Sequence, residues 1–240
     1  MSKLYNINYV PGIEIGAEYK GRRVRVLGYF IDYKNDIFTT IENNGLVNER
    51  NASLERVRRF EKILGVQIPV ERLLHTNRFQ RISGRLLVRH VLNSSLYDEC
   101  EVLKPYRKME MNKAVEILCQ EYFAYGKPCY VMMKCPPLQD VLDVISLTNG
   151  VAVLADGADF LHDEELMKDI LSHGIEGIEV FQSAYNKKQM ADLLRYAQKD
   201  KLLITCGSGF TSRKQGNELG DCHCPEEAES LIISLIRAKM

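Results

Sequence analysis

The sequence predicts an α/β protein in which a parallel sheet, wound with crossover helices, carries a long helical insertion. Short apolar runs alternate with amphipathic segments along the chain, a pattern typical of strands joined by helices. From about residue 150 onward the expected order is strand, helix, strand, helix, strand, helix. Residues 45–137 instead contain several helical periods and no strong strand signal, and a stretch of that length is too long for a loop.

Five apolar runs are the predicted strands. They are residues 9–15, 24–31, 150–155, 175–181 and 201–206. Pro137 suits the first position of a helix, and an Asn-Gly pair ends that helix just before the third strand. Asp163 and Asn186 are expected to cap the next two helices, and Pro225 to begin the last one.

The insertion begins with a clear helical period. Leu54, Val57, Phe60 and Leu64 share one face, and Gly65 is expected to end the helix. Residues 49–90 contain ten Lys or Arg and four Glu, a net charge of +6, whereas residues 151–180 hold eight acidic residues against one Lys. The insertion is therefore basic and the later part of the sheet region acidic.

The composition is that of an ordinary globular protein. The 240 residues are 45% apolar and 27% charged, which excludes wholesale disorder, collagen and a coiled coil. Thirty-two basic and thirty-two acidic residues cancel, so no overall field attracts nucleic acid or an anionic membrane. We see no secretory leader and no membrane-spanning stretch, and expect a cytoplasmic protein with seven reduced cysteines.

Six motifs occur along the chain in a fixed order. They are YVPGIEI at 9–15, VLGYFID at 26–32, VAVLA at 151–155, GIEV at 177–180, CGS at 206–208 and LGD at 219–221. Together they resemble the PHP (polymerase and histidinol phosphatase) superfamily of metal-dependent phosphoesterases. The branch with a helical insertion, acting on nucleotides or short nucleic acids, is the most similar.

The resemblance implies a fold and a kind of chemistry. The family fold is a seven-stranded (β/α) barrel with two or three divalent ions at the C-terminal mouth, where they activate water and bridge the phosphate. Residues 1–44 and 138–240 would form an incomplete (β/α)7 TIM-like barrel lacking its first two strands, and residues 45–137 the helical insertion. Because such a sheet has open edges, we expect a homodimer or a complementing N-terminal fragment.

Most metal ligands that the resemblance implies are replaced. The family's D-x-H-x-H and D-H-D patterns are absent, and Leu86 stands in place of a His. Asp156 replaces another His, and Gly209 and Thr211 replace an Asp and a His. Only Glu14 of nine expected ligands is identical. Glu14 with Asp156 would suffice for a weakly held, hydrated Mg²⁺ or Ca²⁺ but not for a tight Zn²⁺ or Mn²⁺ cluster. The family cofactor is thus a divalent ion (Mg, Mn or Zn), and the ligand count leaves open that none binds.

Several residues are candidates for binding phosphate. Arg78, Arg81, Arg85 and Arg89 recur at helix-compatible intervals; they suit bidentate phosphate contacts or form a solvated helix face. Arg25 falls on an expected hairpin beside the mouth, where many relatives carry His. The turn at Ser208 and Gly209 offers backbone amides to an anion.

One further motif contains soft metal ligands. Cys222, His223 and Cys224 are adjacent, but zinc ligands usually pair two residues apart and the sequence has no second such pair. We expect a loop, with a metal site only if folding brings Cys206, Asp156 or another ligand close.

Three functions remain open at this point. The first is a catalytically degenerate phosphoesterase-like protein, a pseudoenzyme or binding module for a phosphorylated small molecule or nucleotide. The second is an active phosphoesterase on nucleotides or short nucleic acids, completed by a separate N-terminal fragment or by a rearranged site at Glu14 and Asp156. The third is a non-functional fragment of a decayed gene.

Overall fold

The computed structural model describes residues 9–76, 79–210, 218–228, 230 and 232. The chain divides into two compact units, which we call the sheet unit (Met1–Phe38 with Cys135–Met240) and the helical unit (Thr39–Lys134). Among the described residues, no helix combines the length and the apolar character needed to cross a membrane.

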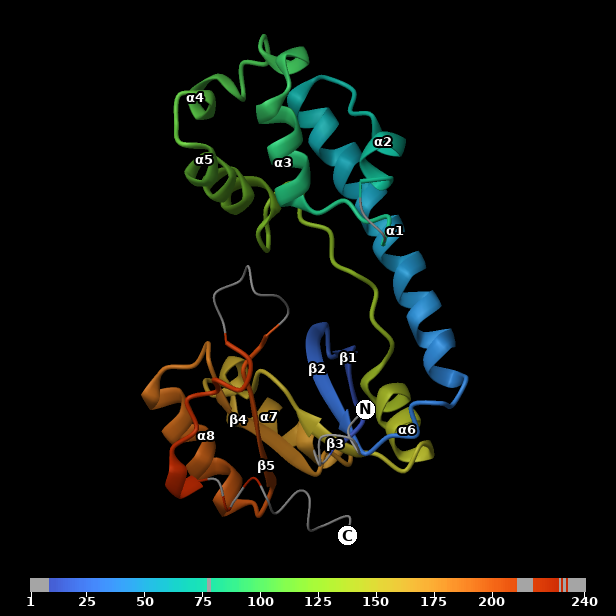
Figure 1. The fold of residues 1–240 in the computed structure, drawn as a ribbon, viewed down its shortest axis with the longest axis vertical. Helices are drawn as coiled ribbons and strands as arrows, with labels where there is room; N and C mark the ends of the chain where they lie inside the picture. The colour runs from blue at the N-terminus through green and yellow to red at the C-terminus, as the bar shows by residue number, and fades with distance from the viewer. Residues whose placement is uncertain (1–8, 77–78, 211–217, 229, 231, 233–240) are drawn as a thin grey trace. The chain divides into compact units, whose positions relative to one another are not determined.

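The sheet unit contains five strands in the order β1-β2-β3-β4-β5 (Figure 1). They are β1 (Gly12–Tyr19), β2 (Arg22–Tyr29), β3 (Val151–Leu154), β4 (Gly177–Gln182) and β5 (Leu203–Gly207). All five predicted strands are present, and β1 and β2 form the hairpin expected at Arg25. The prediction of a parallel sheet holds only for part of it. Only β3, β4 and β5 run parallel, while β2 is antiparallel to both β1 and β3.

The antiparallel start has a local cause. β1 and β2 are joined by Lys20 and Gly21, and both have positive φ angles, of 49° and 74°. Two successive residues in this conformation form the tight turn that suits the twist of a hairpin. The five strands form a single sheet, and its closure into a barrel stays a prediction.

Helices of the sheet unit begin where the sequence predicts. They are α6 (Leu138–Leu147), α7 (Glu164–Ser172) and α8 (Lys187–Lys199). Pro137 immediately precedes α6, and Asp163 caps α7 by accepting a hydrogen bond from the Leu166 amide at 3.1 Å. Asn186 and Gln189 form a reciprocal capping box at α8. After Pro225 the structure describes a single turn, η5 (Glu226–Ala228), and most of the last predicted helix lies outside the described residues.

The core of the sheet unit lies between the strands and these helices. All four residues of β3 and the first five of β4 are buried. Helix α6 packs its predicted apolar face, including Val141 and Ile145, against β1, β2 and β3, and α8 covers β4 and β5 with Leu193 and Ala197. A turn, η4 (Gly157–Phe160), follows β3.

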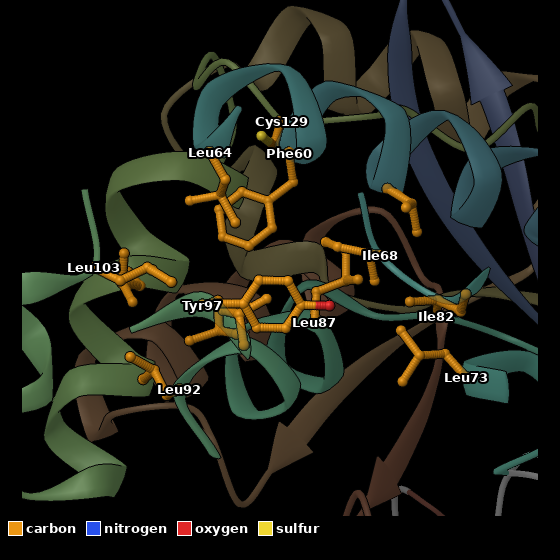
Figure 2. Packing of buried hydrophobic residues seen from close by; sticks show 14 of the residues in the cluster. Phe60, Leu64, Ile68, Leu73, Ile82, Leu87, Leu92, Tyr97, Leu103 and Cys129 are labelled. Atoms are coloured by element: carbon orange, nitrogen blue, oxygen red, sulfur yellow. The ribbon is translucent and has the colours of Figure 1, made fainter. Parts of the chain in front are cut away.

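The helical unit has its own core. Its elements are α1 (Ile37–Leu64), α2 (Val70–Leu74), α3 (Gly84–Asn93), η2 (Ser95–Tyr97), α4 (Lys104–Arg107), α5 (Met111–Leu118) and η3 (Cys119–Phe123). Helix α1 ends, as predicted, before Gly65, which has a φ of 68°. Figure 2 shows Phe60, Leu87 and Tyr97 within the buried cluster of this unit, and all three are at most 4% exposed.

Candidate active site

Polar residues gather at the edge of the sheet where three parallel strands end. Asp156 follows β3, Gln182 is the last residue of β4, and Ser208 follows β5. Because parallel strands end at a common edge, short side chains there can converge on one site. Arg25 reaches the same region from β2, since the Ala155 amide donates a hydrogen bond to the Arg25 carbonyl oxygen at 3.0 Å.

Asp156 lies on a sharp turn. Its φ and ψ are 52° and 32°, a left-handed conformation that is uncommon outside glycine but tolerated by Asp. The following residue, Gly157, has no room for a side chain, because a Cβ would lie 2.7 Å from Ile178 Cδ1. The A-D-G sequence thus turns the chain tightly and presents the Asp156 carboxylate to Arg25.

Arg25 joins the two carboxylates that the family resemblance singles out. Its Nε donates to Asp156 Oδ2, and its Nη1 lies 3.3 Å from Glu14 Oε1. Burial by itself lowers the pKa of Arg25, but the hydrogen bond to Asp156 and the charges of Asp156 and Glu14 raise the pKa above its ordinary value. Arg25 is therefore a permanent cation held between Glu14 and Asp156.

Sequence reasoning missed Glu179 as a site residue. It lies within β4, is only 6% exposed, and accepts a hydrogen bond from Gln182 Nε2 at 2.8 Å. Burial raises its pKa to about 7; the bond from Gln182 opposes this shift, and the charges of Asp156 and Glu14 add to it. The sequence feature that could have identified Glu179 is an acidic residue inside the apolar run G-I-E-V-F. A buried strand tolerates a carboxyl group only where a partner compensates for the cost of its burial.

Neighbouring residues enclose the Glu179 carboxyl. A Cβ at Gly207 would approach Glu179 Oε1 too closely, so a side chain at this strand position would force the Glu179 carboxyl to shift. Burial and the charge of Glu179 together raise the pKa of Tyr29 to about 12. The buried Glu179 carboxyl therefore has a pKa near neutrality, while Tyr29 beside it stays protonated.

The predicted anion turn lies at the end of β5. Ser183 Oγ donates to the Ser208 carbonyl oxygen at 2.7 Å, which joins the segments after β4 and β5. Gly209 has a φ of 61°, which favours glycine, and Thr211 lies outside the described residues. A separate cavity of about 250 Å³ is lined by Arg23, Arg25, Asp156, Asp159 and Phe160.

The other predicted arginines belong to the helical unit. Arg85 and Arg89 lie on α3, whose N-cap is Ser83, so Arg81 precedes the helix. Arg78 lies outside the described residues. Arg81 therefore does not share a helix face with Arg85 and Arg89, contrary to the expectation from their spacing, because α3 begins only at Gly84. A role in phosphate binding for Arg78, Arg81 and Arg85 stays a prediction.

The site does not fit the metal cluster of the family. Glu14 and Asp156 both pair with Arg25, and Glu179 is buried and bonded to Gln182. A divalent ion at Glu14 and Asp156 would lie beside a guanidinium, which repels it. Across the described ranges, no group of three or more His, Cys, Asp or Glu side chains is arranged to hold a metal ion.

Comparison with known proteins finds two curated relatives. Over 206 residues the chain is 25% identical to a phosphoribosyl 1,2-cyclic phosphate 1,2-diphosphodiesterase of Eggerthella lenta, covering 85% of this chain and 73% of that protein. Over 218 residues it is 23% identical to a 3′,5′-nucleoside bisphosphate phosphatase of Chromobacterium violaceum, covering 88% and 70%. No protein-family model matches the chain.

Solved structures share the fold. One is a protein of Bifidobacterium adolescentis assigned as a metal-dependent phosphoesterase, with a TM-score of 0.61 and 20% identity over 97% of this chain and 78% of that one. Another is an amidohydrolase of Chromobacterium violaceum with bound sulfate and no metal, with a TM-score of 0.62 and 21% identity over 96% and 79%.

Proposed function

Since the chain belongs to the PHP superfamily of metal-dependent phosphoesterases, we propose that it binds a phosphorylated small molecule and does not hydrolyse it through a metal cluster. The observation that carries the proposal is the double pairing of Arg25 with Glu14 and Asp156. This pairing places a side chain of the protein itself against both carboxylates that the family resemblance makes candidates for metal binding, and it offsets one of their two negative charges.

The charges explain why a metal-dependent reaction is disfavoured. Hydrolysis through a metal needs an ion that lowers the pKa of a bound water and neutralises the charge that develops on the phosphate. Arg25 supplies positive charge at this place, but a guanidinium does not convert water into hydroxide at neutral pH. The site thus keeps a positive side chain, Arg25, that can attract a phosphate, but it lacks a metal-bound hydroxide to attack that phosphate.

The phosphate is proposed to bind beside Arg25 rather than in place of its carboxylate partners. Arg23 lines the cavity next to Arg25. We propose that the backbone amides of Ser208 and Gly209, which follow β5, add further donors to the phosphate. Asp156 and Asp159 line the same cavity, and their negative charges oppose an anion there. Because the charge of Glu179 interacts with those of Asp156 and Glu14, we expect phosphate binding to strengthen when Glu179 is protonated. The amidohydrolase of the same fold carries a sulfate without a metal, which supports tetrahedral anion binding of this kind.

The relatives suggest the class of ligand. One is named for a cyclic phosphate of a phosphoribosyl compound and the other for a nucleoside bisphosphate. Both ligands join a ribose to a phosphate. We therefore propose a phosphorylated ribose compound or nucleotide as the ligand of this chain.

An active phosphoesterase is the second candidate. It is favoured by the two relatives, both named as hydrolases of phosphate esters and matched over 85% and 88% of this chain. It would require that Arg25 leaves Glu14 and Asp156 when a metal binds.

The experiment measures ligand binding and hydrolysis on the same protein. The full chain is titrated with adenosine 3′,5′-bisphosphate, and phosphate release is followed with and without added Mn²⁺. We expect saturable binding and no Mn²⁺-dependent release. Mn²⁺-dependent turnover that disappears in Glu14→Gln would establish the second candidate, and absence of binding to this and other phosphorylated ribose compounds would contradict the first.

A further inference from the structure

The helical unit contains a cavity of about 560 Å³, lined by residues of α2, α3 and η2. Arg72, Arg89 and His90 contribute to its wall, and none of the described residues that line it is acidic. The wall also contains apolar and uncharged polar side chains, among them Leu73, Leu86, Asn93 and Ser95. The volume lies within the range of small-molecule sites, about 300–1,000 Å³, and the wall combines positive charge with an apolar part.

The two arginines of this cavity have no carboxylate partner. Across the described ranges, the ion pairs do not include Arg72 or Arg89, whereas Arg56 in α1 pairs with Glu49. Arg89 Nη2 instead donates a hydrogen bond to Asn112 Oδ1 at 2.7 Å. This uncharged partner orients the guanidinium of Arg89 without cancelling its charge.

One acidic residue, Glu110, is close enough to Arg89 to respond to its charge. The backbone amides of Asn112 and Lys113 lower the pKa of Glu110 most, burial opposes them, and the charge of Arg89 lowers the pKa further. Glu110 Oε1 accepts from the Asn112 amide at 2.9 Å, and Oε2 accepts from the Lys113 amide at 3.0 Å. The carboxylate therefore caps α5 and does not pair with Arg89.

A cation near the end of a helix can simply stabilise the carbonyl groups there, because they carry partial negative charge. At the end of α3 a different arginine, Arg107, has this role. Its Nη1 donates to the Leu92 carbonyl oxygen at 3.0 Å, and its Nη2 donates to those of Val91 at 2.9 Å and Ser94 at 3.0 Å. The positive charge of the two cavity arginines is therefore available to a ligand.

His90 responds to the charge in the cavity. Burial lowers the pKa of His90 below its ordinary value, and the charge of Arg72 lowers it further. His90 Nε2 lies 3.5 Å from the Tyr97 hydroxyl oxygen. An anion bound beside Arg72 would oppose the effect of that arginine and raise the pKa of His90. The imidazole of His90 is therefore a local probe of binding.

We propose that this cavity binds a phosphate monoester, whose phosphate lies between Arg72 and Arg89. Guanidinium groups suit the bidentate recognition of phosphate oxygens. The organic group of the ester packs against Leu73 and Leu86, the apolar part of the wall. All of these residues belong to the helical unit, so this is a second site, separate from the one proposed at Arg25 and independent of it.

The test follows the ring signals of His90 by NMR while the full chain is titrated with phenyl phosphate. These signals are identified by their loss in His90→Gln. We expect a saturable shift and a higher pKa of His90 in the bound state. Inorganic phosphate should bind more weakly, because it has no organic group to pack against Leu73 and Leu86. Arg72→Gln and Arg89→Gln should each weaken the binding of phenyl phosphate at least about tenfold.

Three further variants are matched to these. Arg72→Lys keeps the charge but not the planar fork, and should bind with intermediate affinity. Arg58→Gln, exposed on α1 and outside the lining of the cavity, should bind as the wild type does. Arg25→Met should also keep the response of His90, because Arg25 belongs to the sheet unit. The outcome is therefore distinguishable from that of the proposed function.

Several results would overturn the proposal. They are the absence of a saturable His90 shift at millimolar phenyl phosphate, the same shift with sodium chloride of equal ionic strength, or equal affinity for phenyl phosphate and inorganic phosphate. Unchanged affinity in Arg72→Gln and Arg89→Gln, or loss of the response in Arg25→Met, would also overturn it. Circular dichroism verifies that each variant is folded.

Discussion

At the scale of single residues, Arg25 determines the electrostatics of the site. Its guanidinium contacts both Glu14 and Asp156, although Asp156 is 131 positions away in the sequence. The sequence named all three residues as candidates through the family resemblance, because Glu14 lies in the first motif, Arg25 directly precedes the second and Asp156 directly follows the third. It did not predict that they would pair with one another, since spacing along a chain does not reveal which side chains meet across a sheet.

Glu179 provides a pH-dependent prediction. Its ordinary pKa is 4.5, and in the folded chain the pKa is about 7. Between these values the folded state binds a proton that the unfolded state has lost. The stability from this group is therefore fully present below pH 4.5 and is lost as pH rises through 7, by about 3 kcal/mol.

Substitution of Glu179 tests this pH dependence. Glu179→Gln keeps an oxygen to accept the bond from Gln182 but cannot ionise, so the fall in unfolding free energy between pH 4.5 and 7.5 should become shallower by about 3 kcal/mol. Urea unfolding at several pH values measures this change of the unfolding free energy with pH. The exposed Glu176→Gln is the control, and an unchanged slope in Glu179→Gln would refute the assignment.

At the scale of elements, Gly177 shows how closely the central strands pack. A Cβ at this first residue of β4 would lie 2.8 Å from the Leu203 carbonyl oxygen and 3.1 Å from Val153 Cγ2. Gly177→Ala should therefore destabilise the sheet unit by about 1–3 kcal/mol, measured by urea unfolding.

Gly45→Ala is the control, because Gly45 lies in α1 and nothing lies within 4 Å of the new Cβ. This substitution should be neutral or stabilising by up to about 1 kcal/mol. Equal losses of stability in both variants would contradict the packing argument.

The capping box of α8 is a second test at this scale. Asn186 Oδ1 accepts from the Gln189 amide, and Gln189 Oε1 accepts from the Asn186 amide, both at 3.0 Å. Asn186→Ala removes one bond and should cost about 1 kcal/mol of unfolding free energy. Lys188→Ala, exposed on the same helix, serves as the reference and should change stability little.

Local signals explain which elements could be predicted. Caps such as Asp163 and Asn186 act within one turn of their helix, so the sequence contains the whole interaction. The β1–β2 hairpin was expected, and the backbone of Lys20 and Gly21 forms its turn. The antiparallel pairing of β2 with β3 was missed, because it joins strands far apart in the sequence. The late start of α3 at Gly84 depends on the Ser83 cap, which the regular spacing of the arginines obscured.

At the scale of the whole molecule, the helical unit has a core of its own. Leu87 is fully buried within this cluster (Figure 2). Leu87→Ala should lower the stability of the helical unit by about 2–5 kcal/mol. Hydrogen exchange of amides in α1 and α3 measures the effect, and Leu96→Ala, at an 82% exposed position, should leave that exchange unchanged. Protection equal to the wild type in Leu87→Ala would contradict a shared core.

The central claim is that Arg25 takes the place of a metal ion between Glu14 and Asp156. Calorimetric titration with Mn²⁺ compares the wild-type chain with Arg25→Met, which frees both carboxylates while keeping a long side chain. We expect no saturable heat from the wild type and weak, saturable binding to Arg25→Met. Stoichiometric Mn²⁺ binding by the wild type that Glu14→Gln abolishes would contradict the claim.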